Sequence, residues 1–177
     1  MRQLFIGLML MMSITAQASD MDRLKQAGFP AQVEGLALKN QAVLNYLWAD
    51  VYAAALYAPA DLTARQAWDQ QKALRLVLYY FRNIDRADVI KAASATLERQ
   101  QTNAGLNPEI ARLHARFRDI RSGDRYALDF RPGRGLNLEI NGQVVFSSSD
   151  DALARAYLGI WLAPEGLSDQ LRDKLLD

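Results

Sequence analysis

One glycine-free run, from Tyr46 to Pro59, constrains the fold of this chain more than any other segment. As a β-strand, it would point alternate side chains to opposite faces. One face would be small and apolar, and the other would be broad, aromatic and polar at its tips. The small face contains Leu47, Ala49, Val51, Ala53 and Ala55, and the aromatic face contains Tyr46, Trp48, Asp50, Tyr52 and Ala54. We expect a helix to pack on the small face, whereas the aromatic face suits a ligand, a partner or water.

The first residues have the order of a secretory signal. Arg2 precedes an apolar stretch from Leu4 to Ile14, and the small-residue sequence Ala16-Gln17-Ala18 follows. The apolar stretch is shorter than the roughly 20 residues that a membrane-spanning helix needs. We therefore expect residues 1–18 to be a signal peptide that is cleaved after Ala18, which would leave no stable membrane anchor. This type of signal favours export to a bacterial periplasm.

Composition excludes several functional classes. The formal net charge is +1, and Arg2 is the only charged residue of the expected signal, so the rest of the chain is formally neutral. The chain therefore lacks the excess of basic residues that would indicate a nucleic acid or a membrane surface as its partner. The absence of cysteine excludes disulfides, thiolate nucleophiles and thiol metal sites. No repeat or long linker divides residues 19–177, which we expect to form a single domain.

Hydrophobic periodicity predicts strands in the first half of the chain. One strand is expected over residues 32–38 and another over 46–57, with the turn between them at 39–41. Residues 74–81 form an apolar run in which Arg75 is the only charge. Such a run is typical of a central strand that is covered on both faces.

Helices are expected on both sides of a second block of strands. Asp85 is a good N-cap, and Asn107-Pro108 is a second helix start signal. From Gly123 the apolar period changes to two, and Asn141-Gly142 is the strongest hairpin signal of the chain. The expected helices cover residues 63–70, 85–101, 107–120, 149–161 and 168–176. This order of elements predicts an α+β fold in which a large antiparallel sheet carries helices mainly on one face.

Three features resemble catalytic or metal sites but favour structural roles. His114 is the only histidine and flanks the apolar side of its helix, without the converging groups that metal or triad chemistry needs. Gly133-Arg134-Gly135 lies between two strands, so we interpret it as a turn and not as a phosphate loop. Asp150-Asp151 stands at a helix start, where carboxylates cap. We therefore expect no catalytic residue, no metal and no cofactor.

The remaining candidates for a site are large rings with polar tips. If the aromatic face of the second strand coincides with Arg75, Val77, Tyr79 and Phe81 of the central strand, a ligand surface results. That surface would suit an amphiphilic small molecule with an apolar body and one acidic end. The predicted ligand-binding residues are Tyr46, Trp48, Asp50, Tyr52, Arg75 and Tyr79. The same residues are also compatible with ordinary core, in which Arg75 pairs with Asp50.

Three segments resemble a known family when they are taken in order. They are VYAAALYAP at residues 51–59, GDRYALDFRPGRGLNLEINGQ at 123–143 and LGIWLAP at 158–164. Together, behind a signal peptide, they resemble the bacterial chalcone isomerase-like family. The resemblance implies the chalcone isomerase fold, an open-faced sandwich in which a helical layer covers a large antiparallel sheet and a ligand cleft lies between them.

The resemblance does not imply catalysis, because this fold has catalytic and non-catalytic members. Plant chalcone isomerases use an arginine on an early strand together with threonine and tyrosine hydroxyls. When the VYAAALY strand is aligned with its counterpart in the plant enzymes, Tyr52 takes the position of the threonine. The catalytic tyrosine of the plant helix then falls near Asp85. The preceding strand, residues 35–47, contains no arginine, and its only cation is Lys39. A lysine lacks the planar fork of arginine and is a poor substitute for it.

Three hypotheses follow from the resemblance and the residues. The favoured one is a non-catalytic periplasmic protein that binds a fatty acid or another amphiphile between sheet and helices, as fatty-acid-binding relatives on this fold do. The alternative is an intramolecular lyase or isomerase with a rearranged site, in which Tyr46, Tyr52 and Tyr79 orient an enolate. The third is a module that docks a protein partner through the same aromatic residues. The missing arginine favours binding over catalysis.

Overall fold

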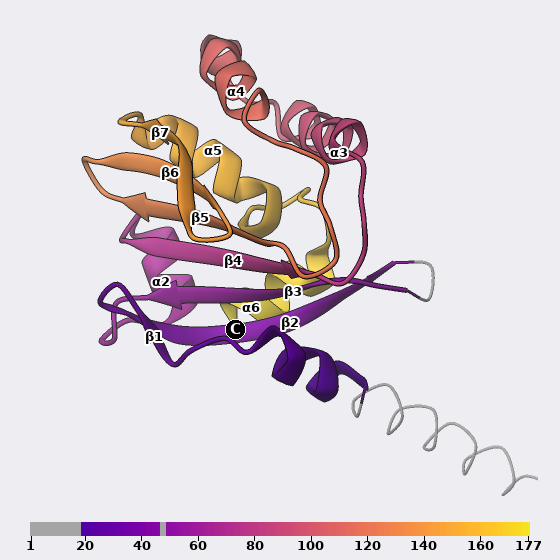
Figure 1. Ribbon diagram of the computed structural model, residues 1–177. Coiled ribbons are helices and arrows are strands. Elements are labelled where there is room, and N and C mark those ends of the chain that lie inside the picture. The colour runs from indigo at the N-terminus through magenta and orange to yellow at the C-terminus, as the bar shows by residue number, and fades with distance from the viewer. Residues whose placement is uncertain (1–18, 47–48) are drawn as a thin grey trace, which may run out of the picture.

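Seven strands form one open antiparallel sheet, in which strands that follow each other along the chain are paired neighbours and β1 and β7 are the edges (Figure 1). The computed structural model describes residues 19–46 and 49–177. The strands are β1 (Gln32–Val33), β2 (Leu36–Tyr46), β3 (Ala49–Ala58), β4 (Leu74–Tyr80), β5 (Arg125–Arg131), β6 (Gly135–Ile140) and β7 (Gln143–Ser148). The expected α+β fold is confirmed, and its two blocks of strands join into one sheet through the pairing of β4 with β5.

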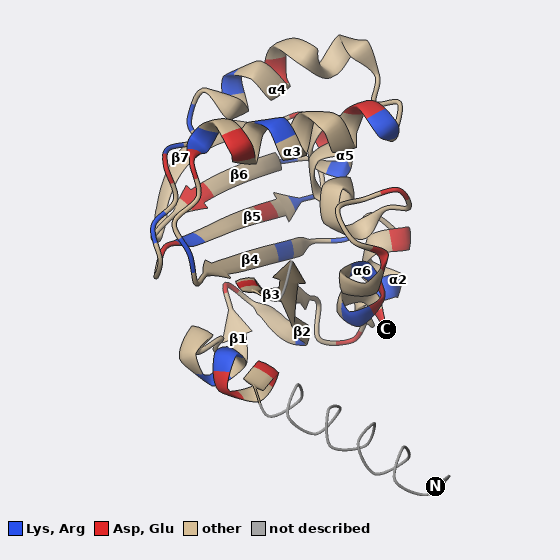
Figure 2. Cartoon of the chain, turned by 90° about the vertical axis from the view of Figure 1, so that its right-hand side faces the viewer, with Lys and Arg blue, Asp and Glu red and all other residues tan. Residues whose placement is uncertain are grey.

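The helices form a layer over one face of this sheet. They are α2 (Ala64–Asp69), α3 (Arg86–Arg99), the 3-10 turn η1 (Ala104–Leu106), α4 (Asn107–His114), α5 (Asp151–Leu162) and α6 (Asp169–Leu176). Helix α5 packs on β5 and β6, α6 packs on β2 and β3, and α3 packs on α5. Charged residues recur along α3, whereas the strands are mostly uncharged (Figure 2).

The opposite face of the sheet is covered in part by the start of the described chain. Residues 19–27 are helical, and Ala27 packs with Val43 and Ala53 there. The Tyr57 hydroxyl on this face donates a hydrogen bond to the carbonyl oxygen of Pro30 at 3.0 Å. Along β3, Ala54 faces the helical layer instead. The expected two-sided strand is therefore present, with the helical layer on one of its faces and the start of the described chain on the other.

The boundary between β2 and β3 differs from the sequence prediction. The turn predicted at residues 39–41 is wrong, because these residues lie inside β2, where Asn40 pairs with Leu56. Lys39 is an extra residue in the pairing, a β-bulge that lets a polar stretch continue the strand. The Asn40 side chain is satisfied by the carbonyl oxygen of Leu175 in α6 at 2.9 Å. Tyr46 consequently ends β2 and does not begin β3.

The helix predicted over residues 107–120 is also shorter than expected. It ends at His114, and Leu106 occupies the N-cap position that we expected for Asn107. Ile120 is nevertheless buried, because it forms an isolated bridge with Ile84. The apolar spacing was therefore a sign of burial in this segment and not of a continuous helix.

Asp150 and Asp151 both hold backbone amides, which confirms the interpretation that this pair is structural. Asp150 is the N-cap of α5 and accepts hydrogen bonds from the amides of Ala152 and Leu153 at 2.8 and 3.2 Å. The Asp151 carboxylate accepts from the amides of Gly133 and Gly135 in the β5–β6 turn at 2.8 and 3.1 Å. The glycine-rich segment is thus a turn, and the chain's own carboxylate satisfies its amides.

Replacing Asp150 with alanine should lower the free energy of unfolding by about 1 kcal/mol, because two amides at the start of α5 lose their acceptor. Asp150→Asn should retain most of the stability, since asparagine caps helices as well as aspartate does. Urea denaturation of both variants tests this prediction. Equal loss in the two variants would show that the charge, and not the cap hydrogen bonds, stabilises this helix start.

Candidate functional site

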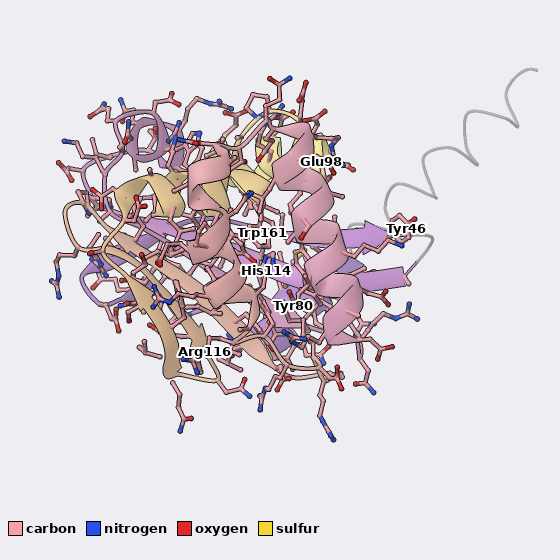
Figure 3. All side chains as sticks on the ribbon, turned by 90° about the horizontal axis from the view of Figure 1, so that it is seen from above. Tyr46, Tyr80, Glu98, His114, Arg116 and Trp161 are labelled. Carbon is pink, nitrogen blue, oxygen red and sulfur yellow. The ribbon has the colours of Figure 1, made fainter. Side chains whose placement is uncertain are left out.

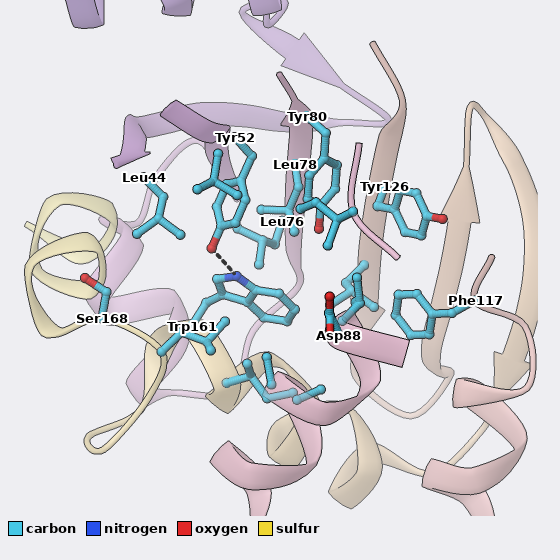
Figure 4. Close-up of a pocket in the computed structure, with 18 of the residues that line it drawn as sticks. Leu44, Tyr52, Leu76, Leu78, Tyr80, Asp88, Phe117, Tyr126, Trp161 and Ser168 are labelled. Carbon is cyan, nitrogen blue, oxygen red and sulfur yellow. Dashed lines mark hydrogen bonds between the residues drawn. The ribbon is translucent and has the colours of Figure 1, made fainter. Parts of the chain in front are cut away.

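A cavity of about 480 Å³ lies between the sheet and the helical layer (Figure 4). Its floor is formed by side chains that alternate along the central strands, and its roof is formed by α3 and α5. The buried floor residues include Tyr52, Leu76, Leu78, Tyr80, Leu128 and Leu138. The roof includes Val89, Ala93, Tyr157, Ile160 and Trp161. Most of this lining is apolar.

Seven aromatic side chains form a closed circuit around the inner part of this pocket. Consecutive ring centroids along the circuit are 5.4 to 6.4 Å apart, and a hydrogen bond from Trp161 Nε1 to Tyr52 Oη, 3.0 Å long, closes it. In order, the members are Tyr52, Tyr80, Tyr126, Phe117, His114, Tyr157 and Trp161. All except His114 line the cavity. Four of the six ring contacts are edge-to-face, and Phe117 stacks on Tyr126, which are the arrangements that aromatic pairs prefer.

The tyrosine hydroxyls inside the pocket are hydrogen-bond donors. Burial raises the pKa of Tyr52, Tyr80 and Tyr157 far above the usual value, so that these phenols stay protonated at neutral pH. Tyr52 already accepts a hydrogen bond from Trp161, which leaves its own proton to donate. The Tyr157 hydroxyl is fully buried and has no hydrogen-bond partner among the described residues.

Exposed lining residues mark the rim of the pocket. They are Asn45, Tyr46, Asp88, Ala92 and Leu167. Tyr46 is 67% exposed and projects at the end of β2, away from the cluster of Tyr80, His114 and Trp161 (Figure 3). Asp88, in the first turn of α3, is the only lining residue in the described chain with a charged side chain at neutral pH. The opening therefore lies between the β2–β3 end of the sheet and α3.

Of the predicted ligand-binding residues, Tyr46 and Tyr52 line the pocket. The grouping of Arg75 and Tyr79 with them is wrong, because both residues point to the opposite face of the sheet. Tyr52 pairs with Tyr80, and Ala53 pairs with Tyr79, so Tyr80 shares the face of Tyr52. Which residues face each other across two strands depends on their register, and neither strand alone encodes it.

Asp50 also lies away from the pocket, because β3 contains a bulge. Leu44 pairs with Tyr52 and Asn45 pairs with Asp50, which leaves Val51 as an extra residue. The bulge reverses the alternation. Val51 therefore lines the pocket in place of Asp50. The Asp50 carboxylate instead accepts from Arg23 Nε and Asn45 Nδ2, each at 2.5 Å. Trp48 lies outside the described residues.

Arg75 belongs to a buried ion pair on the face opposite the pocket. Its guanidinium donates to both carboxylate oxygens of Glu139, at 2.8 and 2.6 Å, and the Arg75 residue is only 8% exposed. Asp129 and Glu34 lie within 3.8 and 3.6 Å of the same guanidinium. Arg75 is thus neither a ligand-facing cation nor the partner of Asp50.

Comparison with known proteins agrees with this architecture. Residues 21–177 match the family model described as chalcone isomerase-like. The chain belongs to that family. No curated protein matches the sequence. Among solved structures, a fatty-acid binding protein of Arabidopsis thaliana has the same fold, with a TM-score of 0.65 over 84% of this chain and 90% of that one, at 18% sequence identity.

This chalcone isomerase-like protein has pocket residues that were not among the predicted ligand-binding residues. Tyr80, Tyr157 and Trp161 are the main ones. Tyr157 and Trp161 are four residues apart on α5, the spacing that places two side chains on one helix face, and they are the two aromatic residues of this helix. That spacing was a usable signal. Tyr80 could be found only together with the register of β3 and β4.

In residues 19–46 and 49–177, no group of three or more acidic or histidine side chains is placed to hold a metal ion. No helix in the same part of the chain is long and apolar enough to cross a membrane.

His114 should make stability depend on pH. Burial and the positive charge of Arg86 lower its pKa below the usual value of about 6.5. The folded state then binds fewer protons than the unfolded state, so stability falls as pH drops below about 6.5 and continues to fall until the folded pKa is reached. Between pH 7.5 and 5.5, His114 should account for a loss of up to about 1.4 kcal/mol.

Urea denaturation at both pH values, in wild type and in His114→Leu, measures this contribution. The variant should show a smaller loss between the two pH values. Glu109 and Asp124 have lowered pKa values in the folded state, so their contributions to stability are lost only at more acidic pH, where carboxylates become protonated. A decline of the same size in wild type and variant would show that His114 is not responsible.

Proposed function

We propose that this protein is a non-catalytic binding protein that holds an amphiphilic small molecule of fatty-acid size in the pocket between sheet and helices. One observation carries the proposal: an apolar cavity of about 480 Å³ is enclosed by an aromatic circuit and opens at a polar rim. Ligand sites are typically apolar hollows of about 300–1,000 Å³ with a few converging polar groups. The Arabidopsis structure on the same fold is a fatty-acid binding protein, which supports this ligand class.

The arrangement of groups favours binding over chalcone cyclisation. Strand β2 contains no arginine, and the ammonium group of Lys39 donates to the carbonyl oxygen of Ala60 at 3.0 Å, outside the pocket. Asp85 occupies the N-cap of α3, where the family's enzymes are expected to carry a catalytic tyrosine. Burial raises the pKa of Tyr52 and Tyr157, so both phenols stay protonated and are not available as general bases at neutral pH.

Native mass spectrometry of the purified protein tests the proposal. A co-purified lipid-like mass, lost on delipidation, is the expected result. The delipidated protein should then bind one equivalent of a long-chain fatty acid or a neutral analogue, with a rise in melting temperature. Added chalcone should show no accelerated loss of absorbance. The proposal fails if the protein is ligand-free and no amphiphile raises its melting temperature, or if chalcone is cyclised at an enzymatic rate.

We also propose that the protein acts after export to the periplasm, with residues 1–18 removed as a signal peptide. The charged, apolar and small-residue order of these residues supports this location. The intact mass of protein extracted from the periplasm of a bacterial host should correspond to a chain that starts at Ser19. Recovery of the full-length chain from the cytoplasm alone would contradict the proposal.

A further inference from the structure

The pocket offers negative charge to a ligand and no positive charge. In the part of the chain that the structure describes, no lysine, arginine or histidine lines it. Its one charged lining residue there is Asp88, in the first turn of α3. The rest of the lining is mostly apolar and rich in aromatic rings, whose faces carry a partial negative charge. An ionised carboxylate that left water for this site would have no cation to pair with, which is strongly disfavoured.

The Asp88 carboxylate is available to a ligand. Figure 4 shows it directed into the space between the rings of Phe117 and Trp161. Salt bridges three residues apart occur at other places in the described chain, but none of them includes Asp88, which is exposed. Arg86, in the same turn, donates instead to the carbonyl oxygens of Phe117 and His114, at 2.8 and 3.0 Å. The charge at the rim is therefore not neutralised by these cations.

The N-terminus of α3 does not compensate by offering a site for an anion. The Arg86 amide donates to the Asp119 carboxylate at 2.9 Å. The amides of Asp88 and Val89 donate to the carbonyl oxygen of Asp85 at 3.0 and 3.2 Å. Three of the amides at this helix start thus have partners within the chain, and Asp119 adds a second carboxylate beside it. This end of the helix favours a cation over an anion at the rim.

The rings that line the pocket are also free of the chain's own cations. Arginine lies over five rings in the described chain, which are Phe29, Trp68, Tyr79, Phe81 and Phe146. None of these five rings lines the pocket. A cation over the face of a Trp, Tyr or Phe ring is attracted to it, and quaternary ammonium groups are recognised by several such rings together. The pocket rings can therefore receive a cation that a ligand brings.

We infer that the ligand has a positively charged head group, an amine or a quaternary ammonium, which the Asp88 carboxylate and the adjoining aromatic rings bind at the rim while the apolar tail lies inside the pocket. This inference rests on the proposed binding function and names the head group of its ligand. A carboxylate head group at the same place would be repelled by Asp88. A fatty acid should therefore bind more weakly than an amine with the same tail.

Three probes with one tail separate the head groups: dodecylammonium, 1-dodecanol and dodecanoate. At pH 7.5 they bring a cation, a neutral group and an anion to the rim. Titration of delipidated protein, below the concentration at which the probes aggregate, gives their affinities by Trp fluorescence. Partly exposed ion pairs and cation–π contacts each contribute about twofold to fivefold, so dodecylammonium should bind about tenfold more tightly than 1-dodecanol. Dodecanoate should bind most weakly.

The variant Asp88→Asn removes the charge and nearly preserves the shape of the side chain. The affinity for dodecylammonium should fall about threefold to fivefold, that for dodecanoate should rise, and that for 1-dodecanol should stay constant. Raising the salt concentration from about 50 to about 500 mM should weaken the preference for the amine more in wild type than in the variant. Glu98→Gln, the matched control, removes an exposed charge of α3 outside the pocket lining and should change none of the three affinities.

Each outcome decides a different point. Preference for the amine, reduced in Asp88→Asn and retained in Glu98→Gln, supports the inference. If the three probes bind equally, or if dodecanoate binds most tightly, the inference is overturned and the proposed binding function stands. An unchanged preference for the amine in Asp88→Asn also overturns the inference, because the head group then lies away from Asp88. If none of the probes binds, the proposed function and the inference are both wrong.

Discussion

Replacing Ala93 with phenylalanine is expected to reduce ligand affinity at least about a hundredfold, equivalent to about 2.7 kcal/mol. Ala93 is 6% exposed on α3 and lines the pocket from above. The added ring would occupy part of the space that the ligand needs. The fold should tolerate it, because the ring enters an existing cavity and does not displace packed side chains. Fluorescence titration gives the affinity, and thermal unfolding checks that the variant is folded.

Ala95→Phe is the matched control. Ala95 lies on the same helix, is exposed, and is not part of the pocket lining. The substitution is chemically identical, so any general effect of phenylalanine on α3 appears in both variants. A hundredfold loss in the Ala93 variant with normal binding in the Ala95 variant would place the ligand under α3. Full binding in a folded Ala93→Phe protein would exclude the pocket as the site.

Replacing Glu139 with alanine is expected to lower the free energy of unfolding by about 3 kcal/mol. The change leaves Arg75 charged and 8% exposed, with only the longer contacts to Asp129 and Glu34 as compensation. The double variant Arg75→Met/Glu139→Leu removes both charges and should recover most of this loss. The free energy needed to desolvate a buried ion pair is nearly as large as the attraction between its two charges. Urea denaturation of the single and double variants gives the coupling between the two residues.

Two comparisons make this prediction specific. Asp22→Ala breaks an exposed pair with Lys25 and should change stability by less than about 0.5 kcal/mol. The double variant should also bind ligand as wild type does, because Arg75 lies on the face opposite the pocket. Weaker binding in a stable double variant would support the earlier expectation that Arg75 holds the acidic end of a ligand. Equal stability of Glu139→Ala and wild type would show that Arg75 is not effectively buried.

The parts of the fold that depend on local signals were predictable from the sequence. The Asn141-Gly142 hairpin connects β6 and β7 as expected, and the caps Thr63, Asp150 and Ser168 begin α2, α5 and α6. Each of these features depends on a few neighbouring residues. The alternating pattern after Gly123 also gave the β5–β6–β7 meander, since period two is encoded within each strand.

The candidate site was only partly predictable, because it depends on pairing between strands. The parity of β3 correctly separated Tyr52 and Ala54 from Ala53 and Ala55, although the helical layer lies over the face of Tyr52 and not over the small face. The bulge at Val51 then moved Asp50 to the other face, and the register of β3 with β4 selected Tyr80 in place of Tyr79. A shift of one residue exchanges every side chain between the two faces of a sheet, so small errors in register replace the whole set of site residues.

The most direct test of the account is to locate a bound ligand by NMR. In a one-to-one complex with dodecylammonium, or with whichever amphiphile binds most tightly, intermolecular nuclear Overhauser effects report which side chains contact the ligand. We predict contacts from the alkyl chain to the rings of Tyr80, Tyr157 and Trp161, which line the pocket between the sheet and α5. Contacts confined to Tyr79 and Phe81, on the opposite face, would contradict it.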